Sequence, residues 1–380
     1  MSRDRKLRVV FVDHVSRLSG GELALLGLVR ALRDDVDAYA VLGEDGPLAE
    51  RLREEGVAVE VLPLAAGLRD LHKDSVRPVG LSPRATVRLP GYVIRLARRL
   101  RRLHPDVVHT NSLKAALYGG AAGRLAGIPV VWHIRDRISD DYLPRPAVRL
   151  VRLAARILPT AVVANSSATL ATLPGARRGS VVYNSVEPRT AASAKDHGAE
   201  LTVGIVGRLA PWKGQHVFLE AFAEAFGDQP VGGRIVGAAL FGEEEYALEL
   251  RNRARDLGIA ERIDFRGFRE PIWDELGDLD VLVHCSVTPE PFGQVVLEGM
   301  AAGLAVVAAD AGGPVELIED GVDGLLVPPG DATTLAGALR RLHADPELRR
   351  RLGEAARERS RAFTPERSAA QLLEIYRAAC

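Results

Sequence analysis

The chain has 380 residues, which is enough for two domains that each bury a core of their own. Lys plus Arg (50) balances Asp plus Glu (50), so net charge gives no reason to expect a nucleic acid or a strongly charged substrate. Hydrophobic residues make up 47% and charged residues 26%, which is a globular composition and excludes a disordered chain. The two cysteines, Cys285 and Cys380, are too few for a disulfide framework and fit a reducing compartment.

The sequence shows no pattern typical of a targeting or membrane-spanning segment. The apolar run at 9–12 is too short for the core of a signal peptide. The longest uncharged stretch, 157–176, contains Pro, Asn, Ser and Thr throughout and makes a poor membrane span. We therefore expect a soluble, cytoplasmic protein, and a peripheral contact with the inner face of the membrane stays open.

In the first half of the chain, short apolar runs alternate with stretches of helical periodicity. The runs lie at 7–12, 37–42, 57–64, 106–111, 128–134, 161–166 and 180–185. The helical stretches lie at 20–32, 47–56 and 114–127. Continuous β-branched runs between helices indicate buried strands, and hence a parallel sheet that is covered by helices on both faces.

The alternation stops and then restarts in the second half. Residues 187–200 are mostly small or charged and lack apolar periodicity, which is typical of a linker. New apolar runs lie at 201–207, 233–238, 262–267, 280–286, 305–310 and 324–330, and helical stretches include 216–226 and 247–258.

These patterns predict an α/β protein with two doubly wound, parallel-sheet domains of Rossmann-like type. We place the N-terminal domain at 1–186, the linker at 187–200 and the C-terminal domain at 201–364. Residues 365–380 are expected to form a helix that packs back on the N-terminal domain. Such sheets bind ligands at the carboxyl ends of their strands, so two facing sheets would place a site in the cleft between the domains.

Two cations lie in the segment VGIVGRLAPWKGQ, in the loop between a predicted strand and a predicted helix. Arg208 and Lys213 are five positions apart, and the helix begins near 214–215. A helix start offers free N–H groups and a positive dipole, so the loop can hold an anion between two cations. The alternative is that both residues are ordinary surface cations.

A second strand–loop–helix segment carries two carboxylates. Glu290 precedes the predicted helix start near 293–294, and Glu298 lies about one turn inside the helix. The backbone N–H groups of Phe292, Gly293, Gln294 and Val295 would point out of the helix start toward an anion. N–H groups can bind a phosphate, and the nearby carboxylates can accept hydrogen bonds from hydroxyls. Together they suit a polyhydroxylated phosphate ester. The alternative is an exposed loop residue and a solvated helix face.

The N-terminal half offers candidates at its own strand ends. Gly20 and Gly21 follow the first strand and permit close approach of a ligand, unless they only form a tight turn. Asp13, His14 and His133 also end strands, and Arg135 follows His133 in HIRD, where it can bind a ligand or pair with Asp136. For His133 a core histidine is the alternative. We interpret three further strand-end residues as turn or cap residues: Asn111, Asn165 and Asn184.

Together these segments resemble the retaining GT-B glycosyltransferases of family four, the glycosyl transferases group 1. The matching segments are GRLAPWKG (207–214), EPFGQVVLE (290–298), VVYNSVE (181–187) and AGGPVELIEDGVDGLLVPPGD (311–331). The segment SRLSGGELALLGLVRAL (16–32) resembles the glycine-rich loop and first helix of the family. The resemblance covers nearly the whole chain, in the order and spacing of the family.

The resemblance implies a retaining, metal-independent hexosyltransferase of the GT-B fold, with an acceptor-binding N-terminal domain and a nucleotide-sugar-binding C-terminal domain. It implies that Arg208 and Lys213 hold the diphosphate, Glu290 the sugar and Glu298 the ribose. Gly267, in RGFRE, would lie by the nucleobase. The family often has a histidine near the place of His133, close to the acceptor and the reacting sugar. From their positions at strand ends and a helix start, we assign Gly21 and 292–295 to the donor and Gly20, Asp13, His14 and Arg135 to the acceptor.

The family chemistry needs no metal where cations and a helix start neutralise the diphosphate, and we expect no cofactor besides the nucleotide-sugar co-substrate. The Asp-x-Asp pairs at 35–37 and 278–280 sit at strand borders. Open alternatives are another GT-B activity, such as a nucleotide-sugar epimerase or a phosphorylase, and a non-catalytic sugar-nucleotide-binding protein. The sequence leaves open the sugar, the base and the acceptor, which can be a polysaccharide, a lipid-linked saccharide or a natural product.

One basic segment, residues 84–105, has a predicted helix with an apolar stripe and many arginines off that stripe. The stripe contains Leu89, Val93, Leu96, Leu100 and Leu103. The arginine face either contacts an anionic membrane or is simply solvated. The preceding residues, 67–83, are expected to form a long loop that covers the acceptor.

Overall fold

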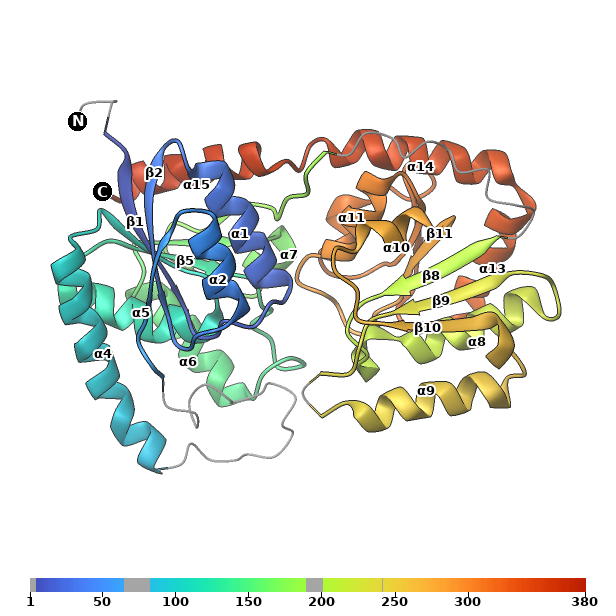
Figure 1. Ribbon diagram of the computed structural model, residues 1–380, viewed down its shortest axis with the longest axis horizontal. Helices are drawn as coiled ribbons and strands as arrows, with labels where there is room; N and C mark the ends of the chain where they lie inside the picture. The colour runs from blue at the N-terminus through green and yellow to red at the C-terminus, as the bar shows by residue number, and fades with distance from the viewer. Residues whose placement is uncertain (1–4, 65–82, 189–200, 241) are drawn as a thin grey trace. The chain divides into compact units, whose positions relative to one another are not determined.

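The computed structural model describes residues 5–64, 83–188, 201–240 and 242–380, drawn in colour in Figure 1. The chain divides into two compact units, and each is described by itself. Unit 1 contains Met1–Ser185 and Pro365–Cys380, and unit 2 contains Val186–Thr364. Most of the expected linker 187–200, and all but one residue of the expected acceptor loop 67–83, lie outside the described residues.

Unit 1 is built on a seven-stranded sheet with the order β3-β2-β1-β4-β5-β6-β7, and every pairing is parallel. Its strands are β1 (Leu7–Asp13), β2 (Val36–Leu42), β3 (Ala58–Val61), β4 (Val107–Thr110), β5 (Val130–Ile134), β6 (Ala161–Ala164) and β7 (Ser180–Val181). The strand order reverses between β1 and β4, which is the kind of place where open parallel sheets bind ligands.

Helices cover both faces of this sheet. Side chains of α1 (Gly20–Leu32), α2 (Pro47–Glu54) and α15 (Pro365–Ala379) share one apolar core with the strands. Side chains of α4 (Pro83–Leu103), α5 (Leu113–Ala126) and α6 (Arg145–Ile157) share the core on the opposite face. A short helix, α7 (Ser167–Ala171), follows β6. The last helix, α15, therefore packs with α1, although the chain reaches it from unit 2.

Unit 2 has a six-stranded parallel sheet with the order β10-β9-β8-β11-β12-β13. Its strands are β8 (Thr202–Val206), β9 (Gly232–Val236), β10 (Ile263–Gly267), β11 (Val281–His284), β12 (Ala305–Ala309) and β13 (Leu325–Val327). Its helices are α8 (Gln215–Phe226), α9 (Glu244–Asp256), α10 (Trp273–Gly277), α11 (Gln294–Ala302), α12 (Pro314–Leu317), α13 (Ala332–Ala344) and α14 (Pro346–Ser360). Two single 3-10 turns, η1 (Pro211–Lys213) and η2 (Ala260–Arg262), complete it.

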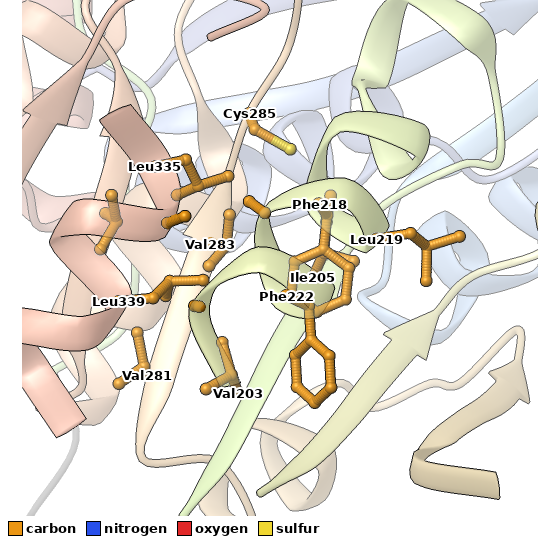
Figure 2. Close-up of a cluster of buried hydrophobic side chains, with 14 of the residues drawn as sticks. Val203, Ile205, Phe218, Leu219, Phe222, Val281, Val283, Cys285, Leu335 and Leu339 are labelled. Atoms are coloured by element: carbon orange, nitrogen blue, oxygen red, sulfur yellow. The ribbon is translucent and has the colours of Figure 1, made fainter. Parts of the chain in front are cut away.

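The core of unit 2 holds the two central strands against their helices. Figure 2 shows apolar side chains of β8 and β11 between residues of α8 and α13. The sequence repeats Phe218, Phe222 and Phe226 at four-residue spacing, so the three rings lie on one face of α8 and contact each other in series. This packing fixes α8, and with it the loop that precedes its first turn.

The predicted fold class, two doubly wound parallel sheets with helices on both faces, is confirmed. Some strands are shorter than their apolar runs: β3 stops at Val61, and β13 ends at Val327 before two prolines, which cannot donate to a ladder. Helix α6 was missed by the sequence interpretation because apolar residues lie on both its buried and its exposed side. Across the described part of the chain, no helix is both long enough and apolar enough to cross a membrane.

Candidate active site

The loop after β8 brings its two cations together on one aromatic ring. The guanidinium of Arg208 lies 5.6 Å from the centroid of the Trp212 ring, and Lys213 Nζ lies 4.6 Å from it. Arg208 Nε also lies 3.4 Å from Glu243 Oε2. Both cations are largely buried, so an anion bound beside them would be poorly screened by water.

Gly214 sets the position of this loop. Its φ is 77°, in the left-handed region, and a Cβ atom there would come within 2.0 Å of the Cys285 carbonyl oxygen. Only glycine fits both constraints. The glycine lets the start of α8 touch the end of β11, which places Lys213 next to the loop that carries Glu290.

Glu290 is buried and is tied to three side chains through one oxygen. Its Oε1 accepts from Lys213 Nζ at 2.6 Å, lies 2.9 Å from His284 Nε2, and accepts a hydrogen bond from the Ser286 hydroxyl. The other oxygen, Oε2, takes part in none of these contacts. Burial acts to raise the pKa of Glu290, but Lys213 and then His284 hold the pKa well below its usual value. The side chain is therefore a carboxylate at neutral pH.

The backbone around Glu290 is held by Gly313, which follows β12. Gly313 N donates to the Glu290 carbonyl at 2.9 Å, and a Cβ on Gly313 would come within 2.2 Å of Phe292 Cα. Helix α11 then begins at Gln294, after Gly293 with φ of 91°. Val296 N donates to the Gly293 carbonyl at 3.0 Å, which tightens the first turn. A helix start of this kind directs backbone N–H groups and positive dipole outward, which suits an anion.

Glu298 lies one turn inside α11, as the sequence predicts. Gln294 Nε2 donates to Glu298 Oε1 at 3.3 Å. Burial raises the pKa of Glu298 to about 7. Glu290 and Glu298 thus have opposite electrostatic environments, because only Glu290 has a cation beside it.

The expected nucleobase segment follows β10. Gly267 ends that strand with φ of 70°, and its carbonyl accepts from Gly237 N at 2.8 Å. The side chains of Arg266 and Arg269 both donate to Glu275, and Phe268 is 60% exposed. Both arginines are thus engaged by Glu275, so the backbone groups and the Phe268 ring are the features of this segment that a base can contact.

In unit 1, Asp13 joins the ends of β1 and β4. Its Oδ1 accepts from His14 N and from Ser112 Oγ, both at 2.7 Å, and its Oδ2 accepts from Asn111 Nδ2 at 2.8 Å. His14 Nδ1 lies 2.8 Å from Ser112 Oγ. Burial acts to raise the pKa of Asp13, but hydrogen bonds from His14, Asn111 and Ser112 lower it. Both oxygens of Asp13 are therefore bound by neighbouring protein groups.

Arg135 links the end of β4 to β5 and to the segment after β7. It donates to Asn111 Oδ1 at 3.0 Å and to Asn184 Oδ1 at 2.5 Å, and its Nη2 lies 3.3 Å from His133 Nδ1. The interpretation of Asn111 and Asn184 as turn or cap residues was wrong, because their side chains bind this half-buried arginine instead. Asp136 accepts from the Tyr142 hydroxyl at 2.6 Å, so its described partner is this tyrosine rather than Arg135.

The contact with Arg135 fixes the tautomer of His133. Burial, followed by the charge of Arg135, holds the pKa of His133 well below its usual value, so the ring is neutral. Arg135 can only donate, so Nδ1 accepts and the ring proton lies on Nε2. Among the described residues, this buried Nε2 has no hydrogen-bond partner. The Nε2–H group of His133 is therefore a hydrogen-bond donor without an acceptor among the described residues.

Three residues of this network were missed by the sequence analysis. His109 lies under His133 with ring centroids 5.3 Å apart, and its Nδ1 lies 2.7 Å from the Tyr376 hydroxyl of α15. Glu22, in the first turn of α1, is buried, and burial followed by the charge of Asp13 raises its pKa to about 7. Only the position of Glu22, directly after Gly20 and Gly21, gave a signal in the sequence.

The glycine pair lies against this network. Asn111 Nδ2 donates to the Gly21 carbonyl at 3.2 Å, and a Cβ on Gly21 would come within 3.4 Å of Arg135 Cδ. A Cβ on Gly20 would meet nothing within 4 Å. Gly21 is therefore the member of the pair whose small size the surroundings use.

Within the described ranges, no group of three or more His, Cys, Asp or Glu side chains is placed to hold a metal ion. The Asp-x-Asp pairs have other partners: Asp37 accepts from Arg8, Asp278 from Arg234 and Asp280 from Thr202 N. These contacts agree with their interpretation as strand borders.

Two family models match the chain. Residues 189–359 match Glycosyl transferases group 1, and residues 47–190 match Glycosyltransferase Family 4. The chain is 30% identical over 380 residues to D-inositol 3-phosphate glycosyltransferase of Nocardiopsis dassonvillei, and the match covers 87% of each. It is 31% identical over 293 residues to exopolysaccharide phosphotransferase SCO2592 of Streptomyces coelicolor, covering 74% of this chain and 30% of that protein.

A solved structure is similar as well. Anabaena HepE in complex with UDP and glucose matches with a TM-score of 0.85 and 29% identity, covering 98% of this chain and 100% of HepE. Fold, family models and relatives together define a GT-B glycosyltransferase that uses a nucleotide sugar. The chain belongs to the glycosyl transferases group 1 family.

Proposed function

We propose that the chain transfers a hexosyl group from a nucleotide-diphosphate sugar to a hydroxyl acceptor, with retention of configuration and without a metal ion. The observation that carries this proposal is the arrangement of Arg208 and Lys213 over Trp212, with Lys213 also bound to the buried Glu290. It places two fixed cations beside the carboxylate that is proposed to meet the sugar.

These cations are proposed to bind the diphosphate, which is the leaving group of the reaction. Negative charge grows on the diphosphate as the bond to the sugar breaks, and fixed donors aimed at that charge stabilise the transition state. Arg208, Lys213 and the N–H groups of 292–295 supply such donors. A metal ion would have the same task, so this set supports metal independence.

Glu290 is proposed to bind hydroxyls of the donor sugar. Its Oε1 is occupied by Lys213, His284 and Ser286, and Oε2 is the oxygen left to accept. The lowered pKa makes Glu290 a weak base. We therefore propose a front-face reaction, in which the acceptor hydroxyl attacks as the donor bond breaks and passes its proton to a diphosphate oxygen.

Glu298 is proposed to accept hydrogen bonds from the ribose hydroxyls, on the same short segment as Glu290. Backbone groups near Gly267 are proposed to contact the base. Gly21 is proposed to admit the donor, because its lack of a side chain lets a ligand lie close to the backbone.

His133 is proposed to act as a hydrogen-bond donor near the reacting sugar. Its Nε2 carries the proton and has no partner among the described residues, so a sugar or acceptor oxygen would satisfy it. Arg135 and Asp13 are proposed to position this donor and the neighbouring backbone, while Gly20 and His14 contact the acceptor. The basis for this division is that Arg135 and Asp13 are each bound by several side chains, whereas the described contacts of the His14 ring are made through Nδ1.

UDP-glucose is the first donor to test, because HepE binds UDP and glucose and is 29% identical to this chain. The acceptor classes to test are a polysaccharide, a lipid-linked saccharide, and an inositol phosphate of the kind named for the Nocardiopsis relative.

The test begins with a panel of UDP-, GDP- and ADP-linked sugars in thermal unfolding. A donor at a hundred times its dissociation constant should stabilise the fold by about 2.7 kcal/mol. The best donor is then incubated with each acceptor in excess chelator, and the anomeric configuration of the product is read by NMR. An inverted product contradicts retention. Stabilisation without turnover on any acceptor contradicts the transferase proposal and favours a binding protein.

A further inference from the structure

Helix α6 of unit 1 exposes an apolar stripe. Leu150, Leu153 and Ile157 are 58%, 55% and 49% exposed, and their spacing places them on one side of the helix. The opposite side carries Val148 and Val151, which are buried against the sheet. No other helix in the described part of the chain exposes three large apolar side chains.

The same helix is strongly basic. Over Arg145–Ile157 it has four arginines, at 145, 149, 152 and 156, and no acidic residue. At 100° per residue all four fall on one flank of the exposed stripe, between it and the buried side. Arg152 donates to the Thr172 and Ile138 carbonyls, and Arg156 to the Pro174 carbonyl. Carbonyl oxygens carry no net charge, so these arginines keep their positive charge.

Helix α4, the basic segment singled out in the sequence, differs in both respects. Its stripe faces the core, where Leu96 and Leu100 are fully buried, and Ile94 is its one exposed large apolar residue among those described. Arg99 is paired with Glu60, and Arg101 donates to the Leu125 carbonyl. On α6, Arg145 pairs with Asp140 at 3.3 Å, but no acidic partner is described for Arg149, Arg152 or Arg156. Helix α6 therefore combines exposed apolar area with unbalanced positive charge.

We propose that α6 docks the protein on an anionic membrane surface, with Leu150, Leu153 and Ile157 in the headgroup region and the arginines against lipid phosphates. Apolar insertion and attraction to anionic lipid are the two forces that hold an amphipathic helix in the interface. A second copy of the chain is the poorer occupant, because a symmetric contact through α6 would set its arginines against their own equivalents. Docking through α6 does not depend on the transferase proposal.

The consequence concerns the acceptor. A protein held on the membrane surface meets lipid-linked acceptors at high local concentration, whereas a small soluble acceptor gains nothing from docking. Docking therefore favours a lipid-linked saccharide among the acceptor classes.

The experiment measures binding of the full chain to vesicles of equimolar phosphatidylglycerol and phosphatidylcholine, and to phosphatidylcholine alone. We expect binding to the anionic vesicles that weakens as salt is raised. The double variant Leu150→Ser/Leu153→Ser should lower the association constant by roughly tenfold or more, since two half-exposed leucines lose their apolar contact. Arg149→Gln/Arg156→Gln should weaken binding to the anionic vesicles.

Leu248→Ser is the matched control, because Leu248 on α9 is also 58% exposed. It should bind as the wild type does, and so should Arg98→Gln/Arg102→Gln on α4. The proposal is overturned if the α4 variant alone abolishes binding, or if Leu248→Ser weakens it equally. It is also overturned if light scattering shows a dimer that Leu150→Ser/Leu153→Ser dissociates while vesicle binding is unchanged. Turnover of a soluble acceptor should be unaffected, which separates loss of docking from loss of activity.

Discussion

Replacing Glu298 by glutamine should stabilise the protein at alkaline pH. Burial raises the pKa of Glu298 to about 7 in the folded protein, from an ordinary value of 4.5. The folded state therefore holds a proton that the unfolded chain gives up. The stability that comes from this proton is fully present below the unfolded pKa and is lost as the pH rises through the folded pKa. A glutamine side chain at this position stays neutral at every pH and can still accept from Gln294.

The magnitude follows from the two pKa values. The raised pKa lowers the free energy of unfolding by about 3 kcal/mol at pH 8, but only by about 1 kcal/mol at pH 5, where the folded side chain is still protonated and only the unfolded chain ionises. Solvent that reaches the side chain makes both figures upper bounds. The advantage of the glutamine variant should therefore grow by about 2 kcal/mol between these pH values, which is roughly 4–8 °C for a domain the size of unit 2.

The assay is thermal unfolding of wild type and Glu298→Gln at pH 5 and pH 8, without donor. Glu249→Gln, at an exposed position on α9 of the same unit, controls for the amide substitution itself. An advantage of Glu298→Gln that is the same at both pH values would refute the reasoning, because it would show that no raised pKa lies at this position.

The same ionisation should govern nucleotide binding, if Glu298 accepts from ribose hydroxyls as proposed. Only the carboxylate is a strong acceptor, so wild-type affinity for UDP should fall as the pH drops below 7, approaching tenfold for each pH unit. Glu298→Gln should bind more weakly at pH 8 and lose this dependence. If wild type and Glu298→Gln showed the same pH dependence of UDP affinity, Glu298 would not be the residue that binds the ribose.

The other predictions concern the pairs that hold the site. Lys213→Ala should lower kcat/KM by at least about a hundredfold and leave Glu290 buried without its cation, which Tm will report. Glu290→Ala should lower kcat strongly, and the kcat of Glu290→Gln should fall between those of wild type and Glu290→Ala. Glu298→Ala should mainly raise the donor KM, and the reverse pattern would exchange the roles of the two glutamates. Tyr376→Phe should lower the free energy of unfolding by about 1–3 kcal/mol, measured in denaturant, because His109 Nδ1 loses its partner. Activity should persist in excess chelator, and restoration by magnesium would contradict this.

The fold was within reach of the sequence because it repeats one local pattern. Each buried strand is a continuous apolar run, and each run is followed by a stretch that can form a helix. Helix α6 was missed because apolar residues lie on both its buried and its exposed side, and its arginines occupy one flank between the two. The helical periodicity of apolar residues reveals a buried face only where the opposite face of the helix is polar, and α6 is apolar on both.

The two halves of the site differ in how much the sequence could show. Arg208 and Lys213 lie in one loop, and Glu290 and Glu298 in one loop and helix start, so local spacing was informative. The network of unit 1 joins Asp13, Asn111, Arg135, Asn184 and Tyr376, which are far apart in the chain. Hydrogen bonds between side chains at distant strand ends have no periodic signature, so a single sequence could not reveal them.

The choice of lysine at 213 follows from the contacts of its ammonium. An ammonium has three donors, and Glu290 Oε1 takes one of them at 2.6 Å. The others can turn toward a phosphate oxygen without breaking the pair, since the group is compact and rotates about its stem. Glu290 then stays ionised and in place while the diphosphate is held. If Glu290 binds the sugar and Lys213 the diphosphate, as proposed, this buried pair fixes the two groups relative to each other before the donor arrives, which is the preorganisation that electrostatic catalysis requires.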